Sequence, residues 1–477
     1  QGVTVYLRGG EYNLDYGINM YSEHSGTKEA PLYISAYNGE RVTVQTGKKI
    51  LGESFKGIDN LEMLSRLNPL VRNKVYCVSL KELGITDYGQ VISRYKEYLQ
   101  PKLYCENAEM RLAHYPNNGT VRVGKVINAG KADKDNALDG ISFTFLDDRP
   151  LKWKDTGDIA ICGGIGWEWS LQNVLISSID KTNHVLNSGD NPQWGVVEAG
   201  SNPYAAPTTY YYYNVFEELD TAGEWYLDRN EGKLYVYPEK NIEECEFFYA
   251  LGNVVPFTVN RANNVVFNGI EFCNGSSDGM NLNGCKNVIV QNCKFSNFTG
   301  TGVRISDCRN SGLTTCEIYN TEQYGVLICD NGDEYKNLIP CRNFVQNCTI
   351  TRQENTSQKP GVATKTTVGA VISHNLFQNF SADAINPDGA ENVVEYNEIS
   401  GACRDVRDMG AIYWAGMFNR GTHIRYNYIH DPSLIKKTGH AVYLDQMGSD
   451  CYVYGNVIDG FNTGFYTHGG REIAVYN

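Results

Sequence analysis

Two aspartates flank near-duplicate apolar words between residues 405 and 445. Asp408 comes just before Gly-Ala-Ile-Tyr (410–413), and Asp445 comes just after His-Ala-Val-Tyr-Leu (440–444). Two carboxyl groups held close together can act as acid and base in the hydrolysis of a glycosidic bond. Aromatic rings and imidazoles beside them suit the stacking and hydrogen bonding of a sugar. The side chains expected to line such a site are Tyr413, Trp414, His440 and Tyr443. For Tyr413 and Trp414, packing within the fold is an equally open interpretation.

The pairing of these acids has an alternative. Direct alignment of the two words places Asp445 opposite Ala415 rather than opposite Asp408. The same alignment puts Asp388 two coils from Asp445, roughly 9–10 Å away at the spacing of stacked strands. Asp388 with Asp445 is therefore the second candidate pair. Each aspartate also has the plainer interpretation of a turn-capping residue.

Three further residues bear on the expected chemistry. Arg407 directly precedes Asp408, and its cation would favour the ionised form of that carboxyl. Asp408 is then expected as nucleophile or base, and Asp445 as the acid. His440 and His468 are expected on the same face, as ligands of sugar hydroxyls or as turn-bonding side chains. No metal and no cofactor is expected.

The sequence repeats from residue 254 onward. Aligned words recur at spacings of 21 to 32 residues, and each holds short β-type segments separated by Asn and Gly. No helical period is present, which excludes leucine-rich and helical repeats and leaves a parallel β-helix. The aligned side chains are expected in one inward column, where Asn can bond the backbone of neighbouring coils. They are Ile270, Cys293, Cys316, Cys348, Asn375, Asn397, Asn427 and Asn456.

A second column of cysteines keeps the same register, at Cys285, Cys308 and Cys341. A metal site or a redox pair is one interpretation. The sequence contains no Cys-x-x-Cys, and each cysteine keeps its place in the repeat, so two stacks of buried core thiols are expected instead.

The repeat predicts an all-β fold, a right-handed parallel β-helix (solenoid) with an inserted β-rich subdomain. Residues 1–58 alternate apolar and polar and are expected to be amino-terminal coils of the same helix. The repeat is lost over 59–250, the expected insertion, which includes a predicted hairpin at 223–238. Residues 251–477 are expected to form the main helix, truncated at its carboxyl end.

Composition narrows the possible partners. The 477-residue chain has a net charge of −13 and no basic run, which argues against nucleic acid or an anionic membrane. No apolar run of about 18 residues is present, so no membrane span is expected. The chain begins at Gln1 and stops within a repeat, and we read it as a piece of a longer protein.

Several motifs follow one another in an order that resembles a known family. They are YLRGGEYNL (6–14), FEELDTAGEWYLDRNEGKLYVYPEK (216–240), DMGAIYWAG (408–416), THIRYNYIHD (422–431) and HAVYLDQMGSDCYVYGNVI (440–458). Together they resemble secreted bacterial β-helix carbohydrate enzymes of glycoside hydrolase family 141, and more distantly family 120. The resemblance spans nearly the whole chain. One departure is Gln446, where relatives often have a second Asp.

The resemblance implies a glycoside hydrolase acting on a plant or host polysaccharide or glycan. It implies Asp408 and Asp445 as the catalytic pair. The repeat spacings of their two coils stretch to 30 and 29 residues, which predicts a cleft walled by the loops 400–408 and 431–438. A carbohydrate polymer or oligosaccharide is the expected partner, and the protein is expected to be secreted or at the cell surface. Two alternatives remain open: a non-catalytic β-helix that binds glycan or builds a surface or filament, and a polysaccharide lyase. A lyase of this kind needs a Lys or Arg base and a cluster of carboxylates for Ca²⁺, which the sequence does not show.

Overall fold

The computed structural model describes residues 2–91, 100–130, 140–154, 158–167, 169–189, 192–198, 208–352, 358–406, 408–416, 419–432 and 439–477. These residues form two compact units. The first unit combines Gln1–Gly47 with Asn253–Asn477, and the second is Lys48–Gly252. The second unit therefore begins earlier than the residue 59 expected from the sequence, because Lys48–Leu51 already pairs with Glu246–Ala250.

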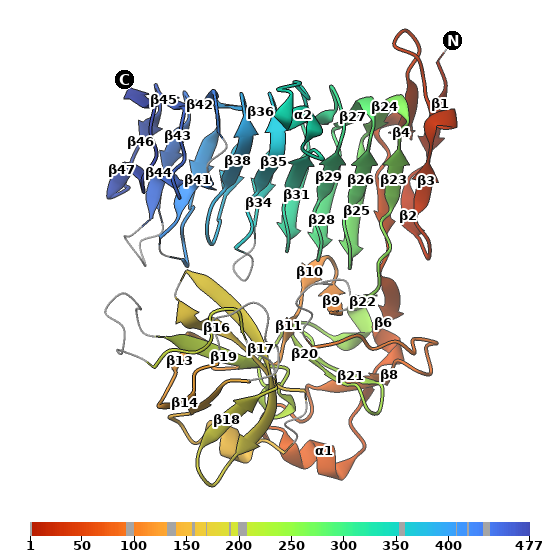
Figure 1. The fold of residues 1–477 in the computed structure, drawn as a ribbon. Coiled ribbons are helices and arrows are strands. Elements are labelled where there is room, and N and C mark those ends of the chain that lie inside the picture. The colour runs from red at the N-terminus through yellow and green to blue at the C-terminus, as the bar shows by residue number, and fades with distance from the viewer. Residues whose placement is uncertain are drawn as a thin grey trace. The chain divides into compact units, whose positions relative to one another are not determined.

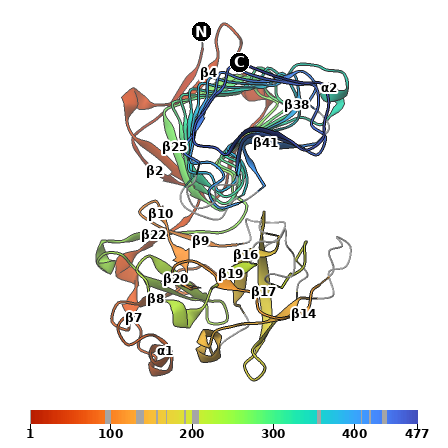
Figure 2. The same ribbon diagram turned by 90° about the vertical axis from the view of Figure 1, so that its left-hand side faces the viewer.

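The first unit is a right-handed parallel β-helix of three long sheets, which Figure 2 shows end-on as three faces of one coil. Sheet A contains β1 (Thr4–Leu7), β4 (Leu32–Ala36), β24 (Asn263–Asn268), β27 (Lys286–Gln291), β30 (Gly312–Thr314), β33 (Phe344–Gln346), β36 (Val371–Ser373), β39 (Val393–Glu395), β42 (Thr422–Arg425), β45 (Cys451–Tyr454) and β48 (Ile473–Tyr476).

Sheet B contains β2 (Gly10–Asn13), β5 (Val42–Gln45), β25 (Ile270–Gly275), β28 (Lys294–Phe298), β31 (Glu317–Thr321), β34 (Thr349–Thr351), β37 (Leu376–Gln378), β40 (Glu398–Ser400), β43 (Tyr428–His430) and β46 (Val457–Ile458). Sheet C contains β3 (Ile18–Met20), β23 (Phe257–Asn260), β26 (Met280–Asn283), β29 (Val303–Ser306), β32 (Val326–Cys329), β35 (Val362–Val368), β38 (Ile385–Ala390), β41 (Gly410–Ala415), β44 (His440–Asp445) and β47 (Thr463–Thr467). Short helical turns lie at η1 (Ser22–His24), η2 (Tyr37–Gly39) and α2 (Asp333–Lys336).

The amino-terminal strands belong to the same solenoid as the later coils. Strand β4 pairs in parallel with β24, β5 with β25, and β3 with β23. The chain thus completes its first coil, leaves at Lys48 and resumes the helix at Asn253, as Figure 1 shows by the colour of adjacent strands. Along each strand every second side chain points inward, which fills the interior with Val, Ile, Leu and Phe.

The predicted inward column is confirmed. Its residues from Ile270 to Asn427 are each at most 2% exposed, and its last member, Asn456, is partly exposed. The asparagines bond one another from coil to coil, at 3.0 Å from Asn375 Nδ2 to Asn397 Oδ1 and 2.9 Å from Asn397 Nδ2 to Asn427 Oδ1. Each Nδ2 also donates to a backbone carbonyl, such as that of Ile372 for Asn397. Every polar atom of these buried amides is therefore paired.

The cysteines of the second column are also core residues. Cys285, Cys308 and Cys341 are each at most 1% exposed and belong to the same interior cluster. Their thiols contact backbone groups, as Cys308 Sγ does with the Leu282 carbonyl at 3.4 Å. All fourteen cysteines of the chain have free thiols. The expectation of stacked core thiols is confirmed.

The second unit is β-rich and contains three smaller sheets. The predicted hairpin is present as β20 (Glu224–Asp228) and β21 (Lys233–Tyr237), which pair antiparallel. The sheets comprise β6 (Lys48–Leu51), β9 (Lys102–Cys105), β10 (Ala108–Glu109) and β22 (Glu246–Ala250); then β7 (Lys56–Gly57), β8 (Tyr76–Ser79), β11 (Arg111–Leu112), β20 (Glu224–Asp228) and β21 (Lys233–Tyr237); then β12 (His114–Tyr115), β13 (Val121–Arg122), β14 (Val126–Asn128), β15 (Ser142–Thr144), β16 (Ala160–Trp167), β17 (Ser170–Asp180), β18 (Val185–Ser188) and β19 (Thr209–Tyr213). Its helical turns are α1 (Leu61–Arg66), η3 (Gly52–Ser54), η5 (Arg149–Lys152), η6 (Phe216–Glu218) and η7 (Ile242–Glu244).

Within the described part of the chain, no helix is long and apolar enough to cross a membrane.

Candidate active site

The candidate acids lie on the last coils of sheet C. Strands β41 and β44 pair in parallel with Tyr413 opposite Tyr443 and Ala415 opposite Asp445, and β44 continues to β47 with Tyr443 opposite Tyr466. Ile412 and Trp414 point into the core, so the alternating Tyr413 and Ala415 point outward. The outer face of these coils thus presents a row of tyrosines beside a row that contains Asp445.

Asp445 is largely buried and surrounded by donors. Its Oδ2 accepts the Tyr413 hydroxyl at 3.0 Å, and its Oδ1 accepts the Gln446 amide at 2.7 Å and faces His468 Nδ1 at 3.0 Å. The Tyr413 hydroxyl and the Gln446 amide both donate to this carboxyl group, one to each oxygen. Because Gln446 contributes through its backbone amide, the contact does not depend on its side chain.

Asp408 is exposed at the turn that leads into β41, with a left-handed backbone at φ 56°. Its Oδ1 accepts the Tyr443 hydroxyl at 3.3 Å. The rings of Tyr413 and Tyr443 meet edge to face, with centroids 5.2 Å apart. Two touching tyrosines on neighbouring coils therefore hold one predicted acid each, and the structure brings Asp408 and Asp445 to one cluster.

The two tyrosines are hydroxyl donors throughout the physiological pH range. Burial raises the pKa of Tyr413 far above its ordinary value, and the charges of Asp445, Asp383 and Asp408 raise it further. Burial, followed by Asp408 and Asp445, likewise raises the pKa of Tyr443. Both phenols consequently keep the protons that they donate to the carboxylates.

The two histidines occupy different positions in this cluster. His440 is half-buried and stacks on Tyr466, with ring centroids 4.5 Å apart and planes 13° apart. Burial lowers the pKa of His440, while Asp408 raises it, and its Nδ1 makes no hydrogen bond within the part of the chain that the structure describes. The side chain of His468 is 72% exposed and contacts Asp445. His468 is therefore a partner of an acid as well as a candidate sugar ligand.

Two predicted lining residues are corrected by the structure. Trp414 is completely buried among the core side chains, because its place in the alternation points inward, so the prediction that it stacks on a sugar is wrong. Tyr443 is 2% exposed, so it positions Asp408 through its hydroxyl and offers no ring face to a ligand. Arg407 and residues 433–438, most of the second of the two predicted wall loops, lie outside the described residues. The tyrosine that is open to solvent is Tyr466, at 40% exposure.

Sequence reasoning missed a third acid, Asp383. Ile385 pairs with Ile412, and Ala384 donates its amide to the Ala411 carbonyl, so Asp383 aligns with Gly410 and His440. Burial raises the pKa of the Asp383 carboxyl to about 7, although its own backbone amide and the cation of Arg352 lower it. The sequence contains a signal that could have identified Asp383, because Ala-Ile at 384–385 matches Ala-Ile at 411–412 on the next coil.

The runner-up acid, Asp388, is half-buried on β38. Burial raises its pKa, and the cation of Lys365 lowers it. Extending the register from Ile385 and Ile412 aligns it with the exposed Ala415, which in turn stands opposite Asp445. In this register two coils separate Asp388 from Asp445, roughly 9.6 Å of strand spacing.

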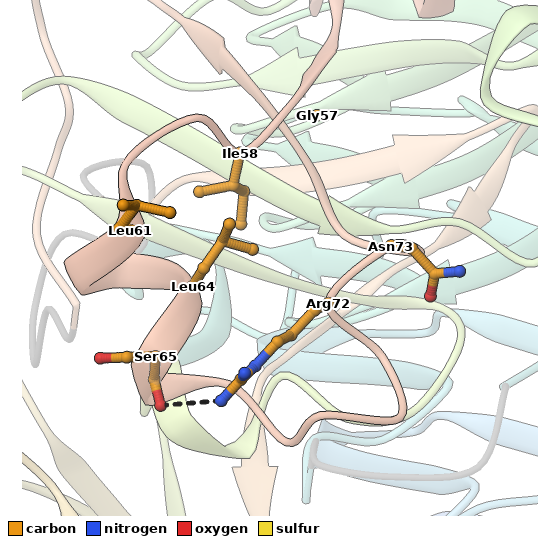
Figure 3. A pocket seen from close by; sticks show the side chains of 7 residues that line it. All are labelled: Gly57, Ile58, Leu61, Leu64, Ser65, Arg72 and Asn73. Atoms are coloured by element: carbon orange, nitrogen blue, oxygen red, sulfur yellow. Dashed lines mark hydrogen bonds between the residues drawn. The ribbon is translucent and has the colours of Figure 1, made fainter.

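The described residues offer few other candidate sites. Among them, no three His, Cys, Asp or Glu side chains are arranged to hold a metal ion. A depression of about 490 Å³ lies on the second unit. Figure 3 shows the side chains that line it, among them Ile58, Leu61, Leu64 and Arg72. Its lining contains no carboxylate. The acid cluster of sheet C is therefore the stronger candidate for glycosidic chemistry.

Comparison with known proteins supports the fold. Residues 226–339 match the family description "Right handed beta helix region". A solved structure described as a glycoside hydrolase aligns with all of this chain and 89% of its own, at 14% identity and a TM-score of 0.77. A structure of XylC with xylose aligns with 96% of this chain and 65% of its own, at 9% identity and a TM-score of 0.47. No curated protein matches the sequence.

Proposed function

We propose that this protein is a glycoside hydrolase that cleaves a plant or host polysaccharide or glycan on the outer face of sheet C. The observation that supports it is the pair of touching tyrosines, each of which donates its hydroxyl to one acid, Tyr413 to Asp445 and Tyr443 to Asp408. Glycoside hydrolysis needs two carboxyl groups on opposite sides of the scissile bond. The similarity to a solved glycoside hydrolase agrees with this proposal at the level of the fold.

The hydrogen bonds favour roles opposite to those expected from Arg407. Asp445 accepts the Tyr413 hydroxyl and the Gln446 amide and contacts His468 Nδ1, and we assign it the role of nucleophile or of the base that activates water. Asp408, exposed and held by one hydroxyl, then delivers the proton to the leaving oxygen. Asp388, whose pKa is raised by burial, is the second candidate for that proton. We also propose that the protein acts outside the cell, where such polymers are found.

The reaction class is tested by product analysis in ¹⁸O-labelled water, with the full chain and a panel of plant and host glycans. Hydrolysis adds one labelled oxygen to each new reducing end, whereas a lyase leaves an unsaturated sugar without it. The activities of Asp408→Asn and Asp388→Asn are compared, and the variant that loses hydrolysis identifies the proton donor. Asp459→Asn, an exposed acid on the same solenoid, is the matched control. Binding without any product would favour the non-catalytic β-helix.

A further inference from the structure

We propose that Cys105 and Cys245 form a disulfide bond when the protein meets a disulfide oxidant, and that this bond stabilises the second unit. The inference goes beyond the proposed function and does not depend on it. Cys105 is the last residue of β9, and Cys245 directly precedes β22. The two strands pair antiparallel, with Cys105 opposite Phe247. The cysteines are 140 residues apart in the sequence and meet on neighbouring strands of one sheet.

The register places both thiols on the same face of this sheet. Cys245 comes two residues before Phe247, so it is the diagonal neighbour of Cys105 on the face that they share. Cys105 packs against the hydrophobic cluster that contains Cys245 and Phe247. The two thiols hydrogen-bond each other, and Cys245 Sγ also contacts the Asn241 carbonyl at 3.4 Å. The two sulfur atoms are thus direct neighbours, as a disulfide bond requires.

Cys105 is the thiol of this pair that solvent reaches. It is half-buried at the end of its strand, whereas Cys245 is 2% exposed. Two other pairs of contacting thiols lie in the interior of the solenoid, where each cysteine is at most 2% exposed. They are Cys285 with Cys308 and Cys316 with Cys348. Cys329 is half-buried as well, but its thiol contacts the Ser306 hydroxyl. A soluble oxidant therefore reaches the Cys105 pair before the pairs of the core.

The bond forms by two thiol–disulfide exchanges with a small disulfide oxidant such as glutathione disulfide. The Cys105 thiolate attacks one sulfur of the oxidant, which gives a mixed disulfide and releases one glutathione thiolate. The Cys245 thiolate then attacks the Cys105 sulfur, forms the internal bond and releases the second glutathione thiolate. The protein loses two electrons and two protons. The oxidant gains the electrons, and the two released thiolates take up the protons.

A cation lies beside the two thiols. Lys240 pairs with Glu106, and its charge acts on both sulfur atoms. Burial raises the pKa of both thiols, and the Lys240 ammonium partly offsets this rise. Because the thiolate is the attacking form, the exchange is slow near neutral pH, and an incubation of hours suits it.

The cross-link acts on the strand that leads back to the solenoid. Strand β22 is hydrogen-bonded to β9 on one side and to β6, the first strand of the second unit, on the other. A bond between residues so far apart in the sequence removes much of the freedom of the unfolded chain. We expect oxidation to raise the melting temperature of the second unit by about 5–15 °C.

Peptide mapping of the full chain detects the bond. The protein is incubated with glutathione disulfide, its remaining thiols are blocked with N-ethylmaleimide in denaturant, and it is digested without reductant. We expect one cross-linked pair of peptides that contains Cys105 and Cys245 and separates on reduction. The other twelve cysteines should all be blocked.

Thermal melting measures the effect on the second unit. Tryptophan fluorescence is the signal, since this unit holds five of the six tryptophans of the chain. The oxidised parent should melt about 5–15 °C above the reduced parent. Cys105→Ser should melt at the same temperature with and without the oxidant. Cys77→Ser, which changes a half-buried cysteine of another sheet in the same unit, should keep the shift.

Blocking of both Cys105 and Cys245 after incubation with the oxidant, or a stable mixed disulfide of Cys105 with glutathione, would overturn the inference. A cross-link between any other two cysteines would do so as well. These results come from the parent protein, so they stand even if Cys105→Ser does not fold. A bond between Cys105 and Cys245 that leaves the melting temperature unchanged would contradict its stabilising role.

Discussion

Tyr413 and Asp445 stand on neighbouring coils, and the Tyr413 hydroxyl donates a 3.0 Å hydrogen bond to Asp445 Oδ2. A second hydrogen bond of the same kind joins Tyr443, whose hydroxyl donates to Asp408 Oδ1. Since the parallel register of the sheet fixes the tyrosines, it also fixes where their hydroxyls place the two acids. The solenoid thus positions groups that are 37 residues apart in the sequence.

Tyr413→Phe should lower catalysis without loosening the fold. It removes one hydroxyl that donates to a carboxylate, a contact worth about 1.5–3 kcal/mol, so we expect kcat to fall roughly 10- to 100-fold. The ring remains and keeps its contact with Tyr443. Steady-state kinetics check this, with Tyr428→Phe, an exposed tyrosine of sheet B, as control. An unchanged kcat would remove Tyr413 from the site.

Trp414→Ala should lower the stability of the fold, because Trp414 is a core residue. Removing a fully buried tryptophan leaves a cavity in the interior and should lower the free energy of unfolding by about 3–5 kcal/mol. Urea denaturation measures the loss. A variant that keeps its stability but loses substrate affinity would show that the indole reaches the ligand after all.

Asn397→Ala should be strongly destabilising for a polar reason. The Asn397 amide accepts from the Asn375 backbone amide and donates to the Ile372 carbonyl, and both partners are buried. Leaving them unpaired should cost roughly 2–6 kcal/mol, at about 1–3 kcal/mol for each buried group. Asn397→Cys is the matched comparison, since Cys348 occupies the same column. It should be the milder change by thermal melting, and equal losses would contradict the ladder argument.

Asp383 should make the protein less stable as the pH rises from about 4 to about 7. Burial raises its folded pKa to about 7, so the folded state holds a proton that the unfolded state has released. Stability therefore falls across that window, by up to about 4 kcal/mol, and is constant above it. Asp383→Asn should remove this slope. Unfolding free energies of parent and variant from pH 4 to 8 check it, and parallel curves would show that Asp383 is ionised in the fold. His440 titrates in both proteins and cancels in the difference.

The fold could be predicted because each coil of a β-helix repeats a similar pattern of residue types. The inward column and the pairing of Ala415 with Asp445 both followed from aligned words, and the structure has both. The alternation of a strand also decides that Trp414 faces the core beside an outward Tyr413. The inward direction of Trp414 could be predicted from this period of two. The sequence left both packing and sugar stacking open for its ring, because an aromatic pair next to an acid also suggests a sugar site.

The contacts within the site were less predictable. The hydroxyl of Tyr443 reaches Asp408 because the backbone turns back at Asp408, where φ is 56°, and a pattern of residues does not specify that angle. The pKa of Asp383 depends on its burial and on the charge of Arg352, which is 31 residues away in the sequence. The start of the insertion at Lys48 was missed because β6 has the same alternation as a coil strand, although it pairs with β22.

The most direct test of the account is the rate of glycan cleavage by Asp445→Asn and Asp408→Asn beside their melting temperatures. We predict that a glycan cleaved by the parent is cleaved at least about a hundredfold more slowly by both variants, as expected for removal of a catalytic acid or base. Their melting temperatures should stay close to that of the parent, since Asn can keep the tyrosine contacts. Cleavage at the parental rate by both variants would contradict the account, as would a parent that cleaves no glycan while both variants unfold.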